Sequence, residues 1–224
     1  MKANDTIEFF YHKFLYNPKN ALIPRYETEL LVREALKIIN YNKIDIVIDV
    51  GTWTWIIPIS IEKNINKTIE IYALEKSKKA ISIANDNKKF LNSSIKIIES
   101  DLISYFFNKY DSLKNLECKN ILFTANLPYI KLNDWINMSE DTRNEPKMAL
   151  FWWKKTWFEL YQKLIKQIIK FKDIYKAKKL ILISEIWFDQ RIISEDFLNI
   201  LGLNPKYISD DANHDRIFLI DIPC

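Results

Sequence analysis

The sequence predicts an α/β fold with a mostly parallel, seven-stranded β-sheet, an antiparallel C-terminal strand and an N-terminal β-hairpin. Short β-branched segments alternate along the 224 residues with longer segments whose apolar residues recur at helical spacing. The segment IDIVIDV at 44–50 is apolar on both faces, which is typical of a strand covered by helices on two sides. This alternation favours a doubly wound sheet.

The N-terminal segments are predicted to form the hairpin, and a helix follows them. Residues 6–17 and 18–26 read as extended segments on either side of the turn residues Asn17 and Pro18. The segment 27–40 has apolar residues at helical spacing and acidic residues in its first turn. We therefore expect the hairpin turn at Asn17 and Pro18 and the first helix from about residue 27.

The remaining elements are predicted in chain order. Pro58 fits a helix only within its first turn, and Ser77 is a suitable N-cap for the helix that follows it. The predicted strands of the large sheet are 44–50, 68–75, 94–101, 120–129, 177–186, 206–209 and 216–222. After the first helix, a second is predicted to begin at residue 56, and three more are predicted at 77–92, 158–175 and 189–201.

The composition indicates a globular protein of the cytoplasm. Apolar residues make up 48% of the chain and the net charge is only +4, which is not the strong positive charge of an obligate nucleic-acid binder. No apolar segment approaches the roughly 18 residues that span a bilayer, and no signal peptide is evident. Cys118 and Cys224 lack metal-ligand spacing and His12 and His214 are isolated, so we expect no metal site.

Polar or special residues follow four successive strands of the predicted sheet. They are Asp49 to Trp55, Glu75, Asp101 and Asn126 to Tyr129. Ligands of a doubly wound sheet bind beyond the carboxyl ends of its strands. An acid after the second strand can accept from both ribose hydroxyls, and an acid after the third can accept from the amine of adenine. Each acid alone could simply cap a helix, but together they favour a nucleoside-type cofactor site.

The tetrapeptide NLPY at 126–129 is suited to holding a planar amide or aromatic amine. The side-chain carbonyl of Asn126 and the backbone carbonyl of Leu127 can together accept both hydrogens of a substrate NH2 group. Pro128 fixes the backbone that follows, and Tyr129 offers a flat face. Catalysis would then come from positioning and polarisation, although an ordinary Asn-x-Pro turn has the same residues.

These features together resemble class I methyltransferases, Rossmann-like enzymes that use S-adenosylmethionine. The segment LIPRYETELLV at 22–32 resembles the IPRPETE segment of the HemK/PrmC family, the release factor glutamine methyltransferases. ANLPYI at 125–130, NEPKMALF at 144–151 and DANHDR at 211–216 are similar to later segments of that family. The resemblance spans roughly residues 9–222, and the combination is far more specific than any one segment.

The resemblance implies an enzyme that methylates the glutamine side-chain amide in the Gly-Gly-Gln motif of peptide chain release factors. Residues 26–224 would form the methyltransferase domain, and residues 1–25 would be a hairpin and linker without the family's helical substrate domain. The implied cofactor-binding residues are Asp49, Gly51, Thr52, Trp53, Trp55, Glu75, Asp101 and Asn126. The implied catalytic residues are Asn126, Leu127, Pro128 and Tyr129.

One departure from the family pattern leaves an alternative open. Family members usually carry Asn-Pro-Pro-Tyr where this chain has Leu127 in the second position. At position 127 it is the backbone carbonyl that would accept from the substrate NH2 group, so we expect the change of side chain to be tolerated. Asn-Leu-Pro-Tyr also resembles the motif of ribosomal RNA adenine dimethyltransferases, so an adenine methyltransferase acting on RNA or DNA remains the second candidate.

The tryptophans form a second departure. The loop DVGTWTW at 49–55 aligns with Asp-x-Gly-Thr-Gly-Ser/Thr-Gly, so Trp53 and Trp55 fall on glycines. Trp152, Trp153, Trp157 and Trp187 also fall on glycines, whereas Trp135 lies in a variable stretch. The chain has only 2 glycines against 7 tryptophans, a low glycine content for a protein with many turns.

A single decoding rule would explain why one bulky residue recurs at these positions. UGA encodes tryptophan in some bacterial lineages and glycine in others, and the Lys, Asn and Ile content fits an AT-rich coding sequence. We hypothesise that UGA codons read as glycine in the source organism appear here as tryptophan. If the tryptophans are genuine, the third candidate is an inactive methyltransferase fold that serves as a binding module.

Overall fold

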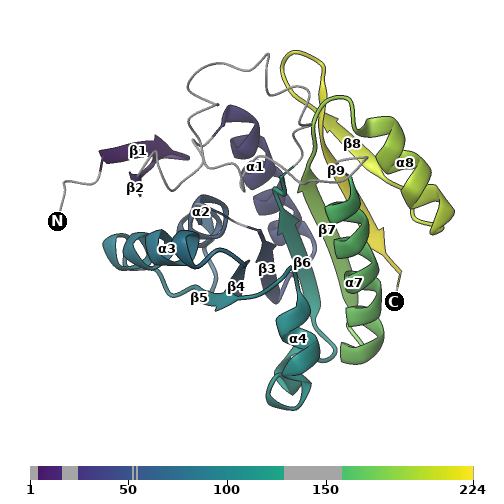
Figure 1. Ribbon diagram of the computed structural model, residues 1–224, viewed down its shortest axis with the longest axis horizontal. Coiled ribbons are helices and arrows are strands. Elements are labelled where there is room, and N and C mark those ends of the chain that lie inside the picture. The colour runs from purple at the N-terminus through teal and green to yellow at the C-terminus, as the bar shows by residue number, and fades with distance from the viewer. Residues whose placement is uncertain (1–4, 17–24, 52, 54, 129–157, 224) are drawn as a thin grey trace.

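A seven-stranded sheet forms the centre of the computed structural model, which describes residues 5–16, 25–51, 53, 55–128 and 158–223 (Figure 1). Its strands are β3 (Ile46–Val50), β4 (Glu70–Glu75), β5 (Lys96–Glu99), β6 (Asn120–Ala125), β7 (Lys179–Glu185), β8 (Lys206–Ser209) and β9 (Asp215–Ile222). Their order across the sheet is β5-β4-β3-β6-β7-β9-β8. The chain leaves β3 toward β4 on one side and later returns to β6 on the other, so the topological switch point lies between β3 and β6.

The directions of the strands agree with the sequence prediction. Strands β3 to β7 pair in parallel, whereas β9 pairs antiparallel with both β7 and β8. β8 therefore points the same way as the parallel strands, and β9 is the reversed strand among those described. The predicted mostly parallel, seven-stranded sheet with an antiparallel C-terminal strand is confirmed.

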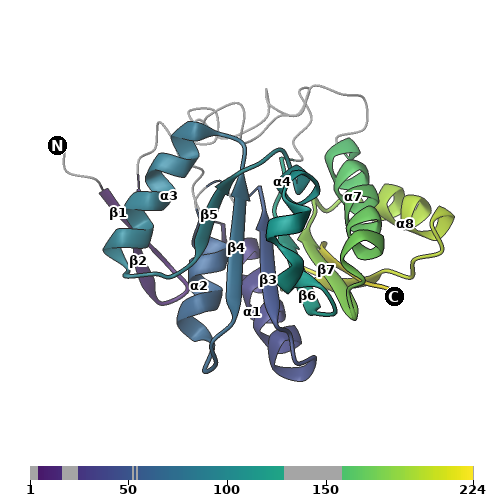
Figure 2. The same cartoon turned by 90° about the horizontal axis from the view of Figure 1, so that it is seen from below.

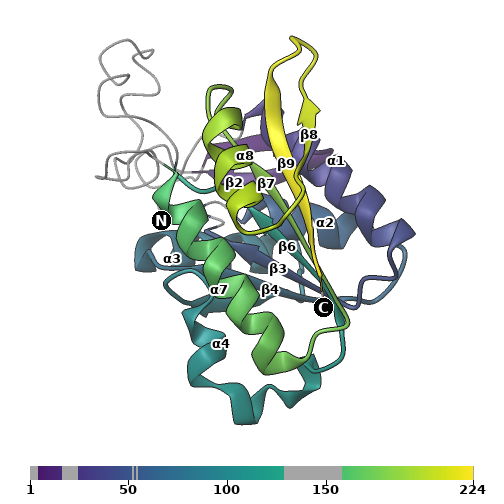
Figure 3. The same cartoon turned by 90° about the vertical axis from the view of Figure 1, so that its right-hand side faces the viewer.

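Helices cover both faces of the sheet. One face carries α1 (Tyr26–Tyr41), α2 (Ile56–Asn64) and α3 (Lys78–Phe90), and the other carries α4 (Ser104–Asn108), α7 (Glu159–Tyr175) and α8 (Arg191–Ile200). Figures 2 and 3 show the sheet between these layers, with α7 and α8 opposite α1 and α2. Along β3, Val47 faces the α1 side while Ile46 and Ile48 face the α7 side. The prediction of a strand buried on both faces is confirmed.

The helix-start predictions agree with the structure. The hydroxyl of Ser77 accepts a hydrogen bond from the backbone N–H of Ala80 at 3.4 Å, as an N-cap does. Pro58 is the third residue of α2 and lies in its first turn. None of the described helices is long and apolar enough to cross a membrane.

The segment between β5 and β6 contains short helices that the sequence pattern does not predict. They are α4 and two 3-10 turns at Tyr110–Ser112 and Lys114–Leu116. Elements of one turn are too short to show helical periodicity. Phe106 of α4 is fully buried against Phe171 of α7, with ring centroids 5.5 Å apart, so tertiary packing holds this segment.

The predicted position of the N-terminal hairpin turn is wrong. β1 (Asp5–Phe9) pairs antiparallel with β2 (His12–Tyr16), and Phe9 lies opposite His12. The turn is therefore Phe10 and Tyr11, and residues 17–24 lie outside the described part. Both turn residues have positive φ, 44° and 67°, as a tight hairpin turn requires. Asn or Gly would usually mark such a turn, but here burial of Phe10, which is 7% exposed, offsets the local cost.

The hairpin packs on α3 and shares its core. Asn87 accepts from the backbone N–H of Leu15 at 2.6 Å and donates to the Leu15 carbonyl at 3.0 Å. Phe14 is fully buried in the same cluster as α1 and α2. The hairpin thus extends the layer of helices on that face.

Candidate active site

Four strands bring their carboxyl ends to one edge of the sheet. The backbone N–H of Trp53, after β3, donates to Glu75 Oε2 at 3.1 Å, and Ser100, after β5, donates from its backbone N–H to the Glu75 carbonyl at 2.8 Å. On the other side of β3, Gly51 lies against Leu127, which follows β6. These contacts join the predicted strand-end residues into one candidate site.

Gly51 is required by its backbone and by its neighbour. Its φ is +69°, a conformation that residues with a Cβ rarely adopt. A Cβ at this position would lie 2.5 Å from Cδ2 of Leu127, which is itself only 2% exposed. The loop after β3 therefore passes close to the residues after β6 only because position 51 is glycine.

Glu75 is a buried carboxylate held by the loop around it. It is 5% exposed, and Oε1 accepts from the backbone N–H groups of Lys76 and Ser77 at 2.8 and 2.7 Å. Burial raises the pKa of Glu75 above its ordinary value, although the backbone donors of Ser77, Trp53 and Lys76 oppose this shift. Each carboxylate oxygen has two lone pairs, so Oε2, which accepts from Trp53, has room for a further donor.

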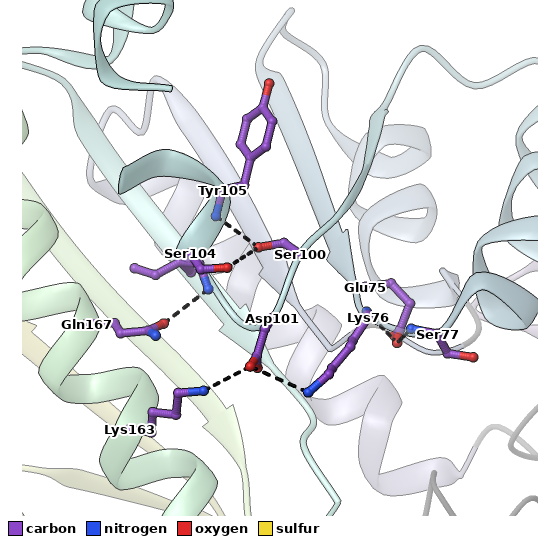
Figure 4. A network of polar contacts seen from close by, with 10 residues as sticks. Glu75, Lys76, Ser77, Ser100, Asp101, Ser104, Tyr105, Lys163 and Gln167 are labelled. Carbon is purple, nitrogen blue, oxygen red and sulfur yellow. Dashed lines mark hydrogen bonds and ion pairs between the residues drawn. The ribbon is translucent and has the colours of Figure 1, made fainter. Parts of the chain in front are cut away.

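Asp101 occupies a more open position beside two lysines. Figure 4 shows Lys163 of α7 and Lys76 pointing toward it from either side, and their Nζ atoms lie 3.0 and 3.5 Å from Oδ2. Partial burial alone would raise the pKa of Asp101, but the hydrogen bond and charge of Lys163, together with Lys76, lower it below the ordinary value. The side chain is 41% exposed, so this carboxylate can still reach a ligand.

Asp49 lies deeper than the other acids. It is fully buried within β3, and the hydroxyl of Thr124 on β6 donates to its Oδ1. Asp49 therefore joins the ends of β3 and β6 from inside the sheet.

Within the described residues, no cluster of three His, Cys, Asp or Glu side chains is arranged to hold a metal.

Asn126 is anchored by residues from two other elements. Its Nδ2 donates to Glu185 Oε2 at 2.8 Å and to the hydroxyl oxygen of Thr28 at 3.2 Å. The Thr28 hydroxyl in turn donates to the same Glu185 oxygen at 2.9 Å. Thr28 lies in the first turn of α1 and Glu185 ends β7, so three segments of the chain meet at this amide.

The backbone carbonyl of Leu127 is part of a neighbouring network. The buried hydroxyl of Tyr161 on α7 lies 3.1 Å from that carbonyl oxygen and 2.7 Å from the Glu185 carbonyl oxygen. One hydroxyl has one hydrogen, and the shorter contact is to Glu185, so the Leu127 carbonyl retains capacity to accept. Burial, followed by the charge of Glu185, raises the pKa of Tyr161 and keeps the phenol protonated as a donor.

Three residues of these networks were not predicted from the sequence: Thr28, Tyr161 and Glu185. Glu185 could have been predicted from the sequence, because it is an acid at the end of an apolar strand, which is the feature that identified Glu75. Thr28 lies in the segment IPRYETE, but its place in the first turn of a helix gives no sign of its partner. Tyr161 is indistinguishable in sequence from an ordinary apolar position of an amphipathic helix.

The loop after β3 has positive φ at alternate residues. The values are +69° at Gly51, +33° at Trp53 and +63° at Trp55. These are the three positions where the resembled family pattern has glycine. The indole nitrogens of Trp53 and Trp55 are buried and have no hydrogen-bond partner among the described residues. The two tryptophans therefore combine an unfavourable backbone conformation with an unmet polar group.

The other predicted residues are placed differently. Trp187 is absent from the positive-φ residues of the described chain, and its ring packs under the guanidinium of Arg216 at 5.2 Å. The backbone at 187 thus does not require glycine. Pro128 follows Leu127 beyond β6 and belongs to no helix or strand. The predicted site residues Thr52 and Tyr129, and the tryptophans Trp135, Trp152, Trp153 and Trp157, lie outside the described residues.

Comparison with solved structures identifies the fold. The hMettl16 catalytic domain, solved in complex with a 3′UTR hairpin, superposes with a TM-score of 0.66 at 14% identity, covering 91% of this chain and 73% of that one. A methyltransferase from Pyrococcus furiosus gives a TM-score of 0.58 at 15% identity, covering 93% of this chain and 87% of that one. At such identities the similarity concerns the fold, which is that of class I methyltransferases.

Sequence comparison identifies the family, although no protein-family profile matches the chain. A release factor glutamine methyltransferase of Enterococcus faecalis is 34% identical over 160 residues, which are 70% of this chain and 53% of that protein. The chain likewise covers only 49% of the relative from Bacillus anthracis, so it spans about half the length of these proteins. A relative from Dictyoglomus turgidum is 30% identical over 204 residues, covering 86% of this chain and 69% of that protein. The chain belongs to the release factor glutamine methyltransferase family.

Proposed function

We propose that this protein transfers a methyl group from S-adenosylmethionine to the glutamine side-chain amide in the Gly-Gly-Gln motif of peptide chain release factors, in the cytoplasm. The observation that carries the proposal is the arrangement at the end of β6. There, Asn126 has its NH2 group turned toward Glu185 and Thr28, next to the Leu127 carbonyl. Asn126 Oδ1 and the Leu127 carbonyl belong to adjacent residues, and two carbonyl oxygens suit the two hydrogens of a primary amide.

The acids at the strand ends fit the proposed cofactor. The buried Glu75 has a carboxylate oxygen with a spare lone pair for ribose hydroxyls, and Asp101 is an exposed acceptor one strand further along. Both groups act only as acceptors when ionised, and hydroxyls and amines are donors. S-adenosylmethionine, when bound, would supply an electrophilic methyl group on a sulfonium sulfur. Glu75, Asp101 and the backbone of the loop at Gly51 would hold it.

The contribution of the chain to the reaction is orientation and polarisation. An amide nitrogen is a poor nucleophile because its lone pair is delocalised into the carbonyl. Asn126 Oδ1 and the Leu127 carbonyl would fix the nitrogen in one direction and polarise its two N–H bonds, which increases the electron density on the nitrogen. In the proposed transfer the N–C bond would form as the sulfonium S–C bond breaks and leaves a thioether. The nitrogen would give up one proton, from an N–H bond already weakened by its acceptor. Water takes that proton, so no strong base is required.

A second part of the proposal concerns the loop after β3: positions 53 and 55 hold glycine in the active protein. A left-handed conformation costs a residue with a Cβ about 1–2 kcal/mol, and a buried unpaired N–H costs a further 1–3 kcal/mol. Glycine removes both costs and lets the loop backbone approach a ligand. A mass spectrum of the native protein over residues 52–63 tests this, and tryptophan masses there would exclude it.

The direct test of the function is methyl transfer from labelled S-adenosylmethionine. The chain, in its given form and with glycine at 53 and 55, is mixed with release factor, with release factor whose motif glutamine is changed to alanine, and with RNA. We expect label only in the unaltered release factor. Label in RNA but not in release factor would instead establish the adenine methyltransferase.

A further inference from the structure

Asn126 and the two side chains that contact it, Thr28 and Glu185, form three hydrogen bonds whose donors and acceptors cannot be exchanged. Glu185 is 1% exposed and Thr28 is 7% exposed, so solvent does not compete for their contacts. A carboxylate accepts and cannot donate. Both groups within 2.9 Å of Glu185 Oε2 in this triangle, Asn126 Nδ2 and Thr28 Oγ1, must therefore be donors.

The orientation of the Asn126 amide follows from this order. The Thr28 hydroxyl spends its one hydrogen on Glu185, so its oxygen can only accept from Asn126 at 3.2 Å. The NH2 group of Asn126 thus faces two acceptors. If the amide rotated by half a turn, Oδ1 would face a carboxylate and a hydroxyl lone pair, and both contacts would be repulsive. Oδ1 is consequently directed away from Glu185 and Thr28.

We propose that Thr28 and Glu185 are positioning residues that hold Asn126 Oδ1 toward the substrate amide. This inference rests on the proposed function for the identity of that amide. The buried carboxylate also polarises the asparagine, because donation from Nδ2 to an anion increases the negative charge on Oδ1 and makes it a better acceptor. The segment IPRYETE, which resembles the family but has no role in the predicted site, thus contributes Thr28 to orientation at the end of β6.

The substitution Glu185→Gln tests the orientation with almost no change of shape. A glutamine can present its own NH2 group to Asn126, so the asparagine can rotate and turn its NH2 group toward the substrate. We expect kcat for release factor methylation to fall by about 10- to 100-fold, by analogy with the loss found when a residue that orients a metal ligand is replaced. KM for S-adenosylmethionine should stay unchanged, because Glu185 lies behind Asn126 rather than at the cofactor acids.

A spectroscopic measurement makes the test independent of turnover. The side-chain NH2 resonances of Asn126, assigned by 15N labelling of the unaltered chain, report the hydrogen bond to a carboxylate. Glu185→Gln should move them, and Thr28→Val should move them in part because it removes only the hydroxyl. Thr28→Ser keeps the hydroxyl. It should therefore leave the resonances close to those of the unaltered chain and kcat within about twofold.

Glu70→Gln is the matched control. Glu70 begins β4 at the opposite end of the sheet, and it accepts from Tyr72 at 2.8 Å and from Asn115 at 3.3 Å. The chemical change is the same as at 185, so kcat and the Asn126 resonances should not respond to it.

The outcomes separate the inference from the proposed function. If Glu185→Gln leaves the Asn126 resonances unchanged, or shifts them without lowering kcat, the positioning role is excluded. If the chain, also with glycine at 53 and 55, methylates no release factor, the proposed function fails. The resonances of Asn126 would still decide whether Glu185 and Thr28 fix its orientation.

Discussion

The loop after β3 and the residues after β6 lie against each other at Gly51 and Leu127, yet their side chains suit their surroundings very differently. After β6, Asn126 makes two hydrogen bonds to buried partners. After β3, Trp53 and Trp55 have positive φ and buried indole nitrogens without partners among the described residues. The two regions face one candidate site, but only the residues after β6 have side chains that suit their local conformation and surroundings.

This contrast shows where the primary structure and the backbone agree. In each of the three hydrogen bonds that join Asn126, Thr28 and Glu185, the donor and the acceptor are determined. This arrangement supports the proposed catalysis. The loop has a backbone made for glycine at three alternate positions and a glycine at only one, Gly51. Where local conformational preference contradicts the fold, a functional or strained site is expected. At this loop, either its role is not the proposed one, or the native protein carries other residues at 53 and 55 than the sequence gives. The predictions below test both regions.

The largest expected effect is at Asn126. Asn126→Ala removes the Oδ1 acceptor and should lower kcat for release factor methylation by about 10²- to 10³-fold, as loss of one preorganised polar group does. Binding of S-adenosylmethionine, measured by calorimetry, should weaken far less than kcat falls, because Asn126 is only one of the implied cofactor-binding residues and Glu75 and Asp101 remain. A variant with near-normal kcat would show that the β6 end does not hold the substrate amide.

The next effect concerns the loop. Changing Trp53 and Trp55 together to glycine should raise the affinity for S-adenosylmethionine by at least about tenfold, equivalent to about 1.4 kcal/mol. The indole at 53 lies on a loop hydrogen-bonded to Glu75, and glycine would free that approach. Trp187→Gly is the control, because its φ is not among the positive values. Equal affinity before and after the loop change would indicate that the tryptophans are compatible with the cofactor site.

Stability distinguishes Trp55 from an ordinary buried aromatic residue. Removing a fully buried aromatic ring usually costs about 3–5 kcal/mol. At Trp55, which is fully buried, relief of the backbone and the unpaired indole should offset much of this cost. In urea denaturation we expect Trp55→Gly to lower the free energy of unfolding clearly less than Phe123→Ala does. Phe123 is also fully buried, lies in β6 and has no positive φ.

Glu75 should make cofactor binding sensitive to acid. Its pKa is raised, chiefly by burial, so it takes up a proton at a higher pH than an ordinary glutamate, whose pKa is about 4.3. Protonation removes acceptor capacity, so affinity should weaken as pH falls toward the raised pKa and recover above it. Calorimetry across this pH range should show the loss in the unaltered chain and a weak but flat profile in Glu75→Gln. A flat profile in both would remove Glu75 from the cofactor site.

The smallest expected effect is at Asp101. Its ion pairs with Lys163 and Lys76 are partly exposed, and such pairs contribute little to stability in water. Asp101→Asn should leave the thermal midpoint almost unchanged and reduce cofactor affinity only a few-fold. A large loss of stability would mean that the pairs with these lysines hold α7 against the sheet.

Much of the fold could be predicted because the pattern is repeated over whole elements. Apolar β-branched strands and amphipathic helices show their period over several residues, and the strand ends then locate Glu75, Asp101 and Asn126. The hairpin turn could not be placed, because Phe10 and Tyr11 adopt positive φ without any turn residue to mark them. Burial of Phe10 outweighs local preference there.

The site was predictable only where chain order places a residue at a strand end. Thr28 and Glu185 meet Asn126 across sequence separations of 98 and 59 residues, and no spacing rule reports such a contact. The positive φ at Trp53 and Trp55 was implied only by the resemblance to a glycine-containing loop. The backbone now supports glycine at those two positions independently, and it does not require glycine at Trp187.

The most direct test of the proposed function locates the methyl group. Release factor treated with the chain carrying glycine at 53 and 55 is digested, and the Gly-Gly-Gln peptide is sequenced by mass spectrometry, with Asn126→Ala in the same background as control. We predict one methyl group on the side-chain amide of the motif glutamine, absent with Asn126→Ala. An unmodified motif glutamine, or a methyl group that Asn126→Ala leaves in place, would contradict the proposed role of the β6 end.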